Sequence, residues 1–403
     1  MKTIFSLLAL AVTFSGDAMA QQPPSGPPPA GCQCAQGHWY DPNVKSCVTT
    51  ACEVVKGMPD GDKGGGFFAW NGHLFTKTAC TNPNTNTCLN GPAGTICTFA
   101  GNGTAGTAPD GSVVKTSPIT PGTLAFHSKF NALLFTENNK IRGVHPMNDT
   151  FYTLAGSGSP GYLEGPALSA RMQDISGLTT HPTLGYVYFS QFNSYALLRS
   201  VNLGSSVTTS LIAGDPNVAN QSVDGPATAG AKMWWPRDIS LSSSGVLYFV
   251  EVFSKKLRTI TNSNQVATVC TFPGVSNVSG FALGSGTDVF LLDATGNRVL
   301  RSSLSCAAPV QLATGLTGPM IYDGAKNRLV LKKGANQVVE IKGVNSNSTV
   351  LAPTVLAGSG AFGNAGDTGA GPAAQLKGVN GLAIGPGGHL YISTGDKIRV
   401  LKQ

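Results

Sequence analysis

The feature of this 403-residue chain that most constrains its fold is an internal repeat. A short phrase such as Thr-Leu-Ala-Gly, a glycine-rich loop and three alternating apolar segments return six times. The phrases begin at Thr98, Thr153, Leu211, Cys270, Leu312 and Val355. A small sheet of this kind can bury its apolar face only against the next sheet, so repeated four-stranded units predict an all-β propeller. Six units predict six blades, and the propeller is expected to span residues 94–403.

The order of the segments also predicts how the ring closes. Each phrase precedes three strand-like segments, but the series begins with a phrase near Cys97 and ends on the three segments between Gly381 and Leu401. We therefore expect Thr95 to Phe99 to be the outer strand of that last sheet. Joining the two ends of the series in one blade removes unpaired strand edges.

One stretch of the second unit carries a resemblance to a known family. Between Thr153 and Asn193 the chain contains Thr-Leu-Ala-Gly, Glu-Gly, Ala-Arg-Met, Gly-Leu and Gly-Tyr-Val-Tyr-Phe-Ser in this order. This series resembles the NHL repeat, and the likeness weakens in the fourth and fifth units. NHL repeats form propellers that commonly have six blades, so the resemblance implies the same scaffold as the periodicity. A scaffold does not by itself imply an activity.

The residues before the repeats differ in composition. Residues 1–20 combine Lys2, an apolar run and the small residues Ala18 and Ala20, which is the pattern of a secretory signal peptide. Residues 21–31 are rich in Pro, Gly and Gln and predict an extended linker. Residues 32–93 predict a small cysteine-rich module. We therefore expect a secreted protein, and no later apolar run approaches the ~20 residues that would span a membrane.

Secretion would place the cysteines in an oxidising compartment, where disulfide bonds form. The candidates are Cys32, Cys34, Cys47, Cys52, Cys80, Cys88, Cys97, Cys270 and Cys306. The last two flank the fourth unit, and we expect a bridge between them. The odd number leaves one thiol unpaired or intermolecular, and the other connections stay open. Asn-x-Ser/Thr sequons predict N-glycosylation in a eukaryotic host at Asn102, Asn148, Asn220, Asn277 and Asn347.

Arginine recurs at a matching place in the third segment of five units. These residues are Arg142, Arg199, Arg258, Arg301 and Arg399, and Glu340 stands in the remaining unit. With a net charge of +7, one interpretation is a surface for polyanions. The other is that each arginine pairs inside its blade with a loop carboxylate such as Asp110, Glu164 or Asp224. A position repeated in every blade usually serves packing, so we favour the second interpretation and expect no nucleic-acid partner.

Histidines bear on one enzyme class that is similar to NHL propellers, the secreted lyase that completes peptide C-terminal amidation. That family holds zinc through histidines placed just after proline at the start of inner strands. Here Pro121, Pro236 and Pro319 are followed by no histidine, so we expect no metal site there. His127 and His181 occupy equivalent places at the ends of inner strands, where we favour a role in turns over a metal pair.

A lactonase-like or strictosidine-synthase-like propeller would instead need acids or amides converging on the channel. The nearest candidates are Asp238, Glu251, Asp293 and Asn380, and for Glu251 and Asp293 we favour capping of the turn after the second strand. We therefore assign no catalytic residue, metal ligand or cofactor. A non-enzymatic function is favoured, with a secreted hydrolase or lyase as the alternative.

The most distinctive local sequence is Met-Trp-Trp-Pro-Arg-Asp at 233–238. Adjacent side chains diverge in a strand, so two neighbouring tryptophans cannot easily face the same core. Exposed tryptophan beside arginine is typical of binding hot spots and sugar-stacking surfaces. The starts of the inner strands converge at one mouth of a propeller, where we expect ligand contacts from Trp234, Trp235, Arg237, Asp238, Asn380 and Thr123. The sequence thus predicts a secreted binding or adhesion protein for an extracellular protein or glycan.

Overall fold

The computed structural model describes residues 91–403 except 145–148, 205 and 346–349, together with strands between 38 and 79. The chain divides into two compact units, Met1–Pro83 and Asn84–Gln403. The described strands of the first unit form one antiparallel sheet in the order β1-β2-β6-β5-β4, with β3 also paired to β6. Their bounds are β1 (His38–Asp41), β2 (Ser46–Thr49), β3 (Glu53–Val54), β4 (Gly61–Gly64), β5 (Phe67–Trp70) and β6 (His73–Ala79). The predicted signal peptide and linker lie outside the described residues.

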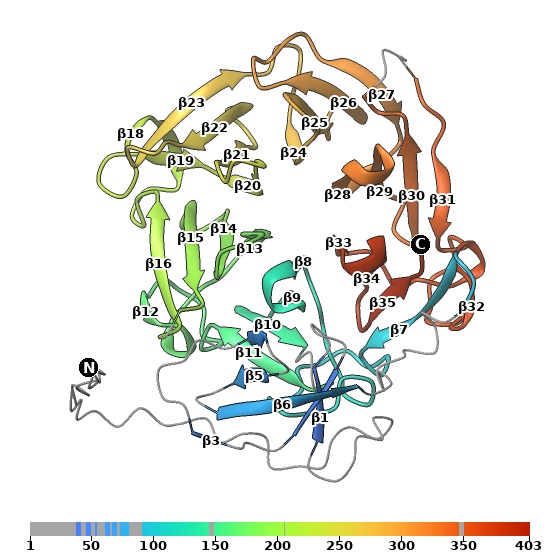
Figure 1. Ribbon diagram of the computed structural model, residues 1–403. Coiled ribbons are helices and arrows are strands. Elements are labelled where there is room, and N and C mark those ends of the chain that lie inside the picture. Colours follow the sequence, from blue (N-terminus) through green and yellow to red (C-terminus); the bar gives the residue numbers. More distant parts are fainter. Residues whose placement is uncertain are drawn as a thin grey trace, which may run out of the picture. The chain divides into compact units, whose positions relative to one another are not determined.

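The second unit is a propeller, and its described strands form six antiparallel blades around one axis (Figure 1). From the inner to the outer strand, blade 1 contains β8 (Leu124–His127), β9 (Ala132–Glu137), β10 (Lys140–Val144) and β11 (Phe151–Ala155). Blade 2 contains β13 (Ile175–Thr180), β14 (Tyr186–Gln191), β15 (Leu197–Asn202) and β16 (Thr208–Ala213). Blade 3 contains β20 (Pro236–Leu241), β21 (Leu247–Glu251), β22 (Lys256–Ile260) and β23 (Gln265–Thr271).

The remaining blades follow the same plan. Blade 4 contains β24 (Val278–Leu283), β25 (Asp288–Asp293), β26 (Arg298–Ser303) and β27 (Val310–Thr314). Blade 5 contains β28 (Thr317–Asp323), β29 (Arg328–Lys333), β30 (Gln337–Lys342) and β31 (Thr354–Ala357). Blade 6 contains β33 (Gly381–Ile384), β34 (Leu390–Ser393), β35 (Ile398–Leu401) and β7 (Thr95–Ala100). The predicted six-bladed, all-β fold is confirmed.

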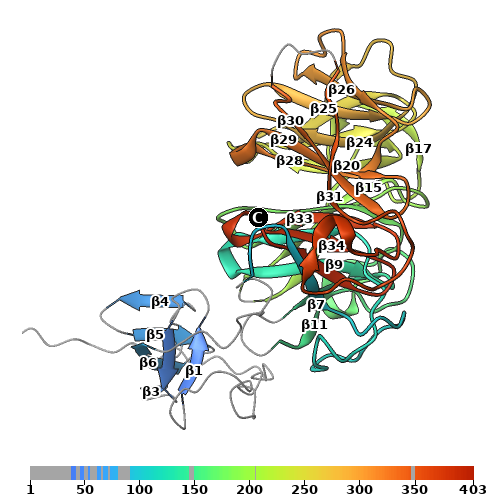
Figure 2. The ribbon, with the colours of Figure 1, turned by 90° about the vertical axis from the view of Figure 1, so that its right-hand side faces the viewer.

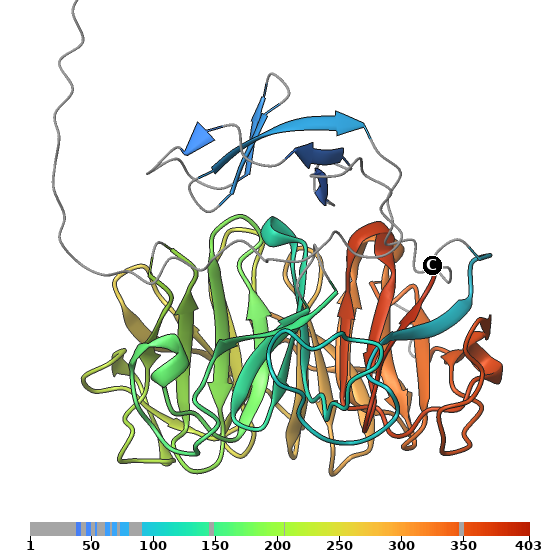
Figure 3. The same ribbon diagram turned by 90° about the horizontal axis from the view of Figure 1, so that it is seen from below.

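Short strands extend some of these sheets. Blades 2, 3 and 6 have a two-residue strand at the outer edge, namely β12 (Gly165–Pro166), β18 (Gly225–Pro226) and β32 (Gly369–Ala370). A separate ribbon pairs β17 (Asn220–Val223) with β19 (Lys232–Trp234), which precede the inner strand of blade 3 in the sequence. Seen edge-on, the long strands of the propeller run between its two faces (Figures 2 and 3).

The ring closes as predicted. Strand β7 pairs antiparallel with β35, with Cys97 opposite Val400 and Ile96 opposite Leu401. Figure 1 shows the cyan β7 beside the red β35. Backbone hydrogen bonds continue past the strands, because Gly94 N donates to Lys402 O at 2.9 Å. The predicted strand therefore completes blade 6, with only the two-residue β32 outside it.

The recurring arginines lie inside the blades. Arg142, Arg199, Arg258 and Arg399 are at most 1% exposed. Each forms an ion pair with a carboxylate from the glycine-rich loop, the partners being Asp110 (3.1 Å), Glu164 (2.9 Å), Asp224 (2.8 Å) and Asp367 (2.7 Å). The predicted pairing is confirmed for these four blades. Their charges tie each loop to its blade and leave no basic surface at these positions.

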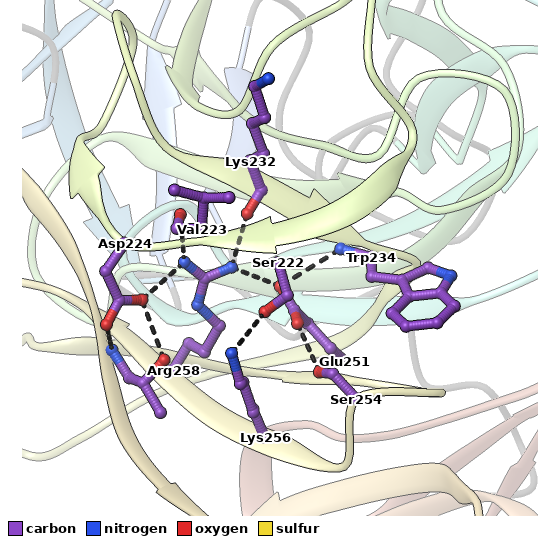
Figure 4. A network of polar contacts seen from close by, with 10 residues as sticks. Ser222, Val223, Asp224, Lys232, Trp234, Glu251, Ser254, Lys256 and Arg258 are labelled. Carbon is purple, nitrogen blue, oxygen red and sulfur yellow. Dashed lines mark hydrogen bonds and ion pairs between the residues drawn. The ribbon is translucent and has the colours of Figure 1, made fainter.

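Figure 4 shows this network in blade 3. The Arg258 guanidinium donates to the carbonyl oxygens of Val223 and Lys232, each at 2.7 Å, and also contacts Glu251 and Asp224. Two blades depart from the pattern. In blade 5, Glu340 pairs at 2.7 Å with Arg328 from the second strand, and in blade 4 the half-buried Arg301 donates to Val344 O at 3.2 Å.

The structure shows disulfide bonds at three of the candidate cysteines. Cys270 in β23 is disulfide-bonded to Cys306, with their Cα atoms 5.9 Å apart, as predicted. Cys97 is also disulfide-bonded. The candidates Cys32, Cys34, Cys52, Cys80 and Cys88 lie outside the described residues, as does the side chain of Cys47.

Three of the five candidate glycosylation sites lie among the described residues. Asn102 and Asn220 are exposed, Asn277 is half-buried, and Asn148 and Asn347 lie outside the described residues. Modification of these asparagines stays a prediction. Across the part of the chain that the structure describes, no helix has the length and apolar character needed to cross a bilayer.

Candidate functional site: the axial cavity

The inner strands enclose a cavity of about 560 Å³ on the propeller axis. Each inner strand contacts the inner strands of both neighbouring blades, so β8, β13, β20, β24, β28 and β33 form a closed ring. All six contribute residues to the cavity wall. Side chains that are distant in sequence can therefore meet one ligand here, as they do in ligand pockets generally.

The inner strands approach one another so closely that some positions require glycine. A Cβ atom added to Gly177 would lie 2.6 Å from the carbonyl oxygen of Arg237 in the next blade. The same addition to Gly381 would place a Cβ 2.6 Å from the carbonyl oxygen of Gly122. A hydroxyl then joins the blades, since Ser393 Oγ donates to Gly122 O at 2.5 Å and Ser190 Oγ donates to Arg237 O.

Three charged side chains line the cavity: Arg237, Asp238 and Lys332. Asp238 is half-buried and its Oδ2 accepts a hydrogen bond from Phe281 N of blade 4 at 3.0 Å. Burial raises the pKa of Asp238 to about 6, although nearby Arg237 and this hydrogen bond oppose the rise. The carboxyl of Asp238 therefore gains and loses its proton close to neutral pH. Groups with shifted pKa values of this kind are frequent in functional sites.

The two cations of the cavity wall differ from the other arginines in their surroundings. Burial, and then the positive charge of Arg237, lower the pKa of Lys332. In residues 91–403, as far as they are described, neither Arg237 nor Lys332 forms an ion pair. Arg237 is exposed and its guanidinium lies 6.0 Å from the ring centre of Phe192, which also lines the cavity.

Aromatic side chains lead from the surface to this cavity. Trp234 is 37% exposed, and its ring centre lies 5.8 Å from that of Phe253, which is 43% exposed. The ring centres of Phe253 and Trp235 are 4.8 Å apart, and Trp235 meets Phe192 edge-on with ring centres 5.9 Å apart. We call Trp234, Phe253, Trp235 and Phe192 the aromatic row. Figure 4 shows the Trp234 indole directed away from the buried network around Arg258.

The structure brings together four of the six residues that the sequence assigned to the ligand. Arg237, Asp238, Asn380 and Thr123 line the cavity. The tryptophans lie beside it: Trp234 is exposed, and Trp235 is half-buried between two phenylalanines. The prediction that they contact the same ligand stays a prediction. Sequence reasoning missed Lys332, Phe192 and Phe253, and a residue-by-residue comparison of the six repeats would have found the unusual charge of Lys332.

The other candidate residues have structural partners. Glu251 accepts hydrogen bonds from Trp234 N at 3.2 Å and from Ser254 Oγ at 2.5 Å. Asp293 accepts from Asn277 N and Gly296 N, both at 3.2 Å. Both acids therefore fix the turn after the second strand, as predicted, and neither lines the cavity.

The two histidines differ from each other. His181 Nδ1 accepts a hydrogen bond from Leu184 N at 3.0 Å, which is the predicted role in a turn. His127 is 1% exposed, contacts the Phe130 ring at 4.8 Å, and neither ring nitrogen has a hydrogen-bond partner among the described residues. The described residues contain no group of three or more His, Cys, Asp or Glu side chains placed to hold a metal ion.

Comparisons with known proteins find similar folds but no similar sequences. No protein-family model and no curated protein matches the sequence, so the NHL resemblance stays a prediction. A protein of unknown function from Bacteroides thetaiotaomicron is 12% identical over 91% of this chain and 89% of its own, with a TM-score of 0.53. A luciferin-regenerating enzyme is 10% identical over 76% of this chain and 95% of its own, with a TM-score of 0.50.

A gluconolactonase from Xanthomonas campestris is also similar. It is 10% identical over 77% of this chain and 98% of its own, with a TM-score of 0.47. At these identities the likeness extends to the propeller scaffold alone, because one scaffold supports many unrelated functions. The function must be argued from the axial cavity and its surroundings.

Proposed function

We propose that the protein is an extracellular binding protein that takes the end of a glycan chain in the axial cavity. The observation that carries this proposal is the aromatic row, which leads from exposed Trp234 and Phe253 to Phe192 in the cavity wall. Aromatic rings offer large apolar faces at little entropic cost, and sugars stack on such faces through their C–H groups. The signal-peptide pattern of residues 1–20 supports an extracellular location.

The cavity favours a glycan over a protein partner. Its volume of about 560 Å³ lies within the ~300–1,000 Å³ range of small-ligand pockets. The wall mixes apolar groups such as Met320 with the polar side chains of Ser176, Ser279 and Asn380. A concave site with a few polar groups suits one end of an oligosaccharide better than the broad surface of a folded protein.

A glycan array probed with the purified full-length secreted protein tests this function. The double variant Trp234→Ala/Phe253→Ala should lose at least about tenfold in affinity for the glycan identified, because exposed aromatic anchors are typical hot spots. Its melting temperature should stay close to that of the wild type, since both side chains are substantially exposed. Leu168→Ala is the matched control, because Leu168 is 59% exposed and lies outside the aromatic row.

Two results would overturn the proposal. One is the absence of any glycan ligand on the array, and the other is full affinity in the double variant. Loss of binding together with a large drop in melting temperature would assign Trp234 and Phe253 to packing. In that case Phe253→Leu, which keeps apolar contacts but removes the ring, decides whether stacking is needed.

A hydrolase or lyase is the second candidate, and Asp238 is the observation that favours it. A carboxyl group with a pKa of about 6 in a cavity can serve as a general acid or base near neutral pH. Asp238→Asn keeps an oxygen that can accept the hydrogen bond from Phe281 N but cannot exchange a proton. Turnover of a lactone or glycosidic substrate that disappears in this variant, at unchanged melting temperature, would support an enzyme. Turnover that persists in Asp238→Asn would exclude this role for the carboxyl.

A further inference from the structure

We propose that Arg237 and Lys332 form an anion-binding subsite in the axial cavity, so that the ligand carries a carboxylate or sulfate group, as an acidic sugar does. This inference rests on the proposed function for the identity of the ligand as a sugar. The subsite itself rests on the placement of two cations, which a comparison of the six blades with one another makes plain.

Strand pairing defines two equivalent positions in each blade. The first axial position lies two residues before the inner-strand residue that pairs with the centre of the second strand. Its occupants are Gly122, Ser176, Arg237, Ser279, Gly318 and Asn380. The second axial position is the residue that follows this central residue in the second strand. Its occupants are Thr136, Ser190, Val250, Leu292, Lys332 and Ser393.

Ten of these twelve positions are uncharged, and the crowding of the inner strands explains why. Small hydroxyl residues at the second axial position hydrogen-bond to the inner strands, as Thr136 Oγ1 does when it accepts from Thr123 N at 3.0 Å. Aliphatic residues such as Leu292 fill the same place in other blades. The architecture therefore needs no cation at either axial position.

Arg237 and Lys332 are the two exceptions, and both line the same cavity. Of the residues at the second axial position, Lys332 alone reaches the cavity within the described part of the chain. The two cations come from blades 3 and 5, on either side of blade 4, and the charge of Arg237 is felt at Lys332. With Asp238 ionised, the charged side chains of the wall sum to +1, and they give the cavity a positive potential.

The other arginines show that these cations do not serve the scaffold. Arg142, Arg199, Arg258 and Arg399 are buried inside blades and each has a carboxylate partner. Within the described residues, Arg237 and Lys332 have no such partner, and their charges repel each other. The charge of Lys332 is unfavourable for folding, because burial and the like charge of Arg237 both penalise its charged form. A ligand anion would supply the missing charge.

The chemistry of the two groups fits a carboxylate or sulfate. Arginine presents planar paired donors that match two oxygens of one anion, and lysine adds a compact point charge. Asn380 and Ser279 lie in the same wall and offer groups for sugar hydroxyls. The aromatic row leads to Arg237 through Phe192, so a stacked sugar chain would bring its terminal acidic group to the cations.

The test compares methyl β-glucuronide with methyl β-glucoside, which differ in the carboxylate, by calorimetric titration of the full-length protein at low ionic strength. The wild type should bind the glucuronide at least about tenfold more tightly, as expected for charge-assisted hydrogen bonds. Lys332→Met and Arg237→Gln should each remove most of that preference. Lys333→Met is the matched control, because it deletes the same charge at the next, exposed residue, which does not line the cavity.

Inorganic sulfate provides a second readout that is independent of sugar binding. Sulfate should raise the melting temperature of the wild type and of Lys333→Met, and it should have little effect on Lys332→Met. Equal affinity for the two glycosides, or a sulfate effect that survives Lys332→Met, would overturn the subsite. If no glycan binds on the array but glucuronide still binds and this binding depends on Lys332, only the proposed function would be overturned.

Discussion

At the scale of single residues, the axial cavity combines groups that the rest of the scaffold avoids. Asp238 stands where three other blades have glycine, at Gly177, Gly280 and Gly381, and its carboxyl accepts a hydrogen bond from the neighbouring blade. Arg237 and Lys332 face the same space without ion-pair partners among the described residues. Charges that lower stability are frequent where a protein binds or reacts, because function then compensates for their cost.

Replacing Lys332 should therefore stabilise the protein. Lys332→Met removes a half-buried charge near Arg237, so its melting temperature should exceed that of the wild type in the absence of ligand. The folded protein lowers the pKa of Lys332 below 10.5, so the charged form is penalised at neutral pH and the penalty fades as pH rises towards 10.5. The difference in melting temperature between Lys332→Met and the wild type should therefore become smaller at alkaline pH.

Lys333→Met supplies the comparison for this stability test. It should leave the melting temperature near that of the wild type, because Lys333 is exposed. A lower melting temperature for Lys332→Met would mean that the aliphatic stem of Lys332 stabilises the blade by more than its charge destabilises it.

His127 should make the propeller sensitive to acid. Burial, together with the nearby charges of Lys129 and His181, lowers the pKa of His127 from 6.5 to about 4. The neutral form is therefore favoured in the folded state, and this contribution is fully present above pH 6.5 and is lost as pH falls through 4. The full loss is on the order of 3 kcal/mol.

The variant His127→Phe isolates this effect. It keeps an aromatic ring beside Phe130 but cannot be protonated. Melting temperatures measured between pH 7 and 4 should fall less steeply for the variant than for the wild type. Parallel slopes would show that other groups control acid unfolding.

The sequence predicts only part of the cavity wall. The convergence of the inner-strand starts predicts that Arg237, Asp238, Asn380 and Thr123 lie at the axis, and all four line the cavity. The backbone of Trp235 has a φ of +54°, a left-handed conformation, and its ring lies beside Phe253. Lys332 was missed because the repeat pattern is weak in the fifth unit, so that its equivalence to Ser190 and Leu292 emerges only when the repeats are compared position by position.

At the scale of elements, the strand β7 has the largest effect on the assembly of the ring. Deleting residues 94–101 should expose the edge of β35, and an exposed edge pairs with other molecules. We expect aggregation at low concentration, measured by size-exclusion chromatography with light scattering. Ala370→Pro in β32 is a mild control, because blades 2 and 3 already have proline at this place. A monomeric deletion variant with unchanged melting temperature would contradict closure by β7.

The disulfide between Cys270 and Cys306 should stabilise the connection between blades 3 and 4. It closes a loop with a sequence separation of 36 residues, for which the chain-entropy treatment gives about 3 to 4 kcal/mol. The double variant Cys270→Ser/Cys306→Ser should lose stability of this order in denaturant unfolding. Peptide mapping without reductant provides the direct check, and the recovery of both thiols free would refute the bond.

The prediction of elements depended on how strongly each repeat keeps its pattern. The strands of blade 6 followed from their alternating apolar pattern, and the position of β7 followed from the order of the phrases. The ribbon of β17 and β19 was not predicted, because it lies in a loop whose sequence has no period of two. The ion pair of Glu340 with Arg328 was also missed, because the sequence pattern assigns Glu340 to the place of the recurring arginines, whereas strand pairing puts Val339 there.

At the scale of the whole molecule, repetition provides the scaffold and departures from it indicate the site. Six similar sheets suffice to predict the ring, because each blade repeats the same burial pattern against its neighbours. A cavity on the axis depends instead on residues contributed once each by different blades. No pattern within a single repeat encodes their meeting, so its contents emerged only from the three-dimensional arrangement.

The pairing of β7 with β35 has a consequence for biosynthesis. About three hundred residues separate the paired Cys97 and Val400, so β7 leaves the ribosome long before its partner exists. Blades 1 to 5 can form in the order of translation, as chain segments generally do. Blade 6 cannot, and the first strand of the ring must wait unpaired until the last has been made. Any factor that protects a nascent strand edge would act during this interval.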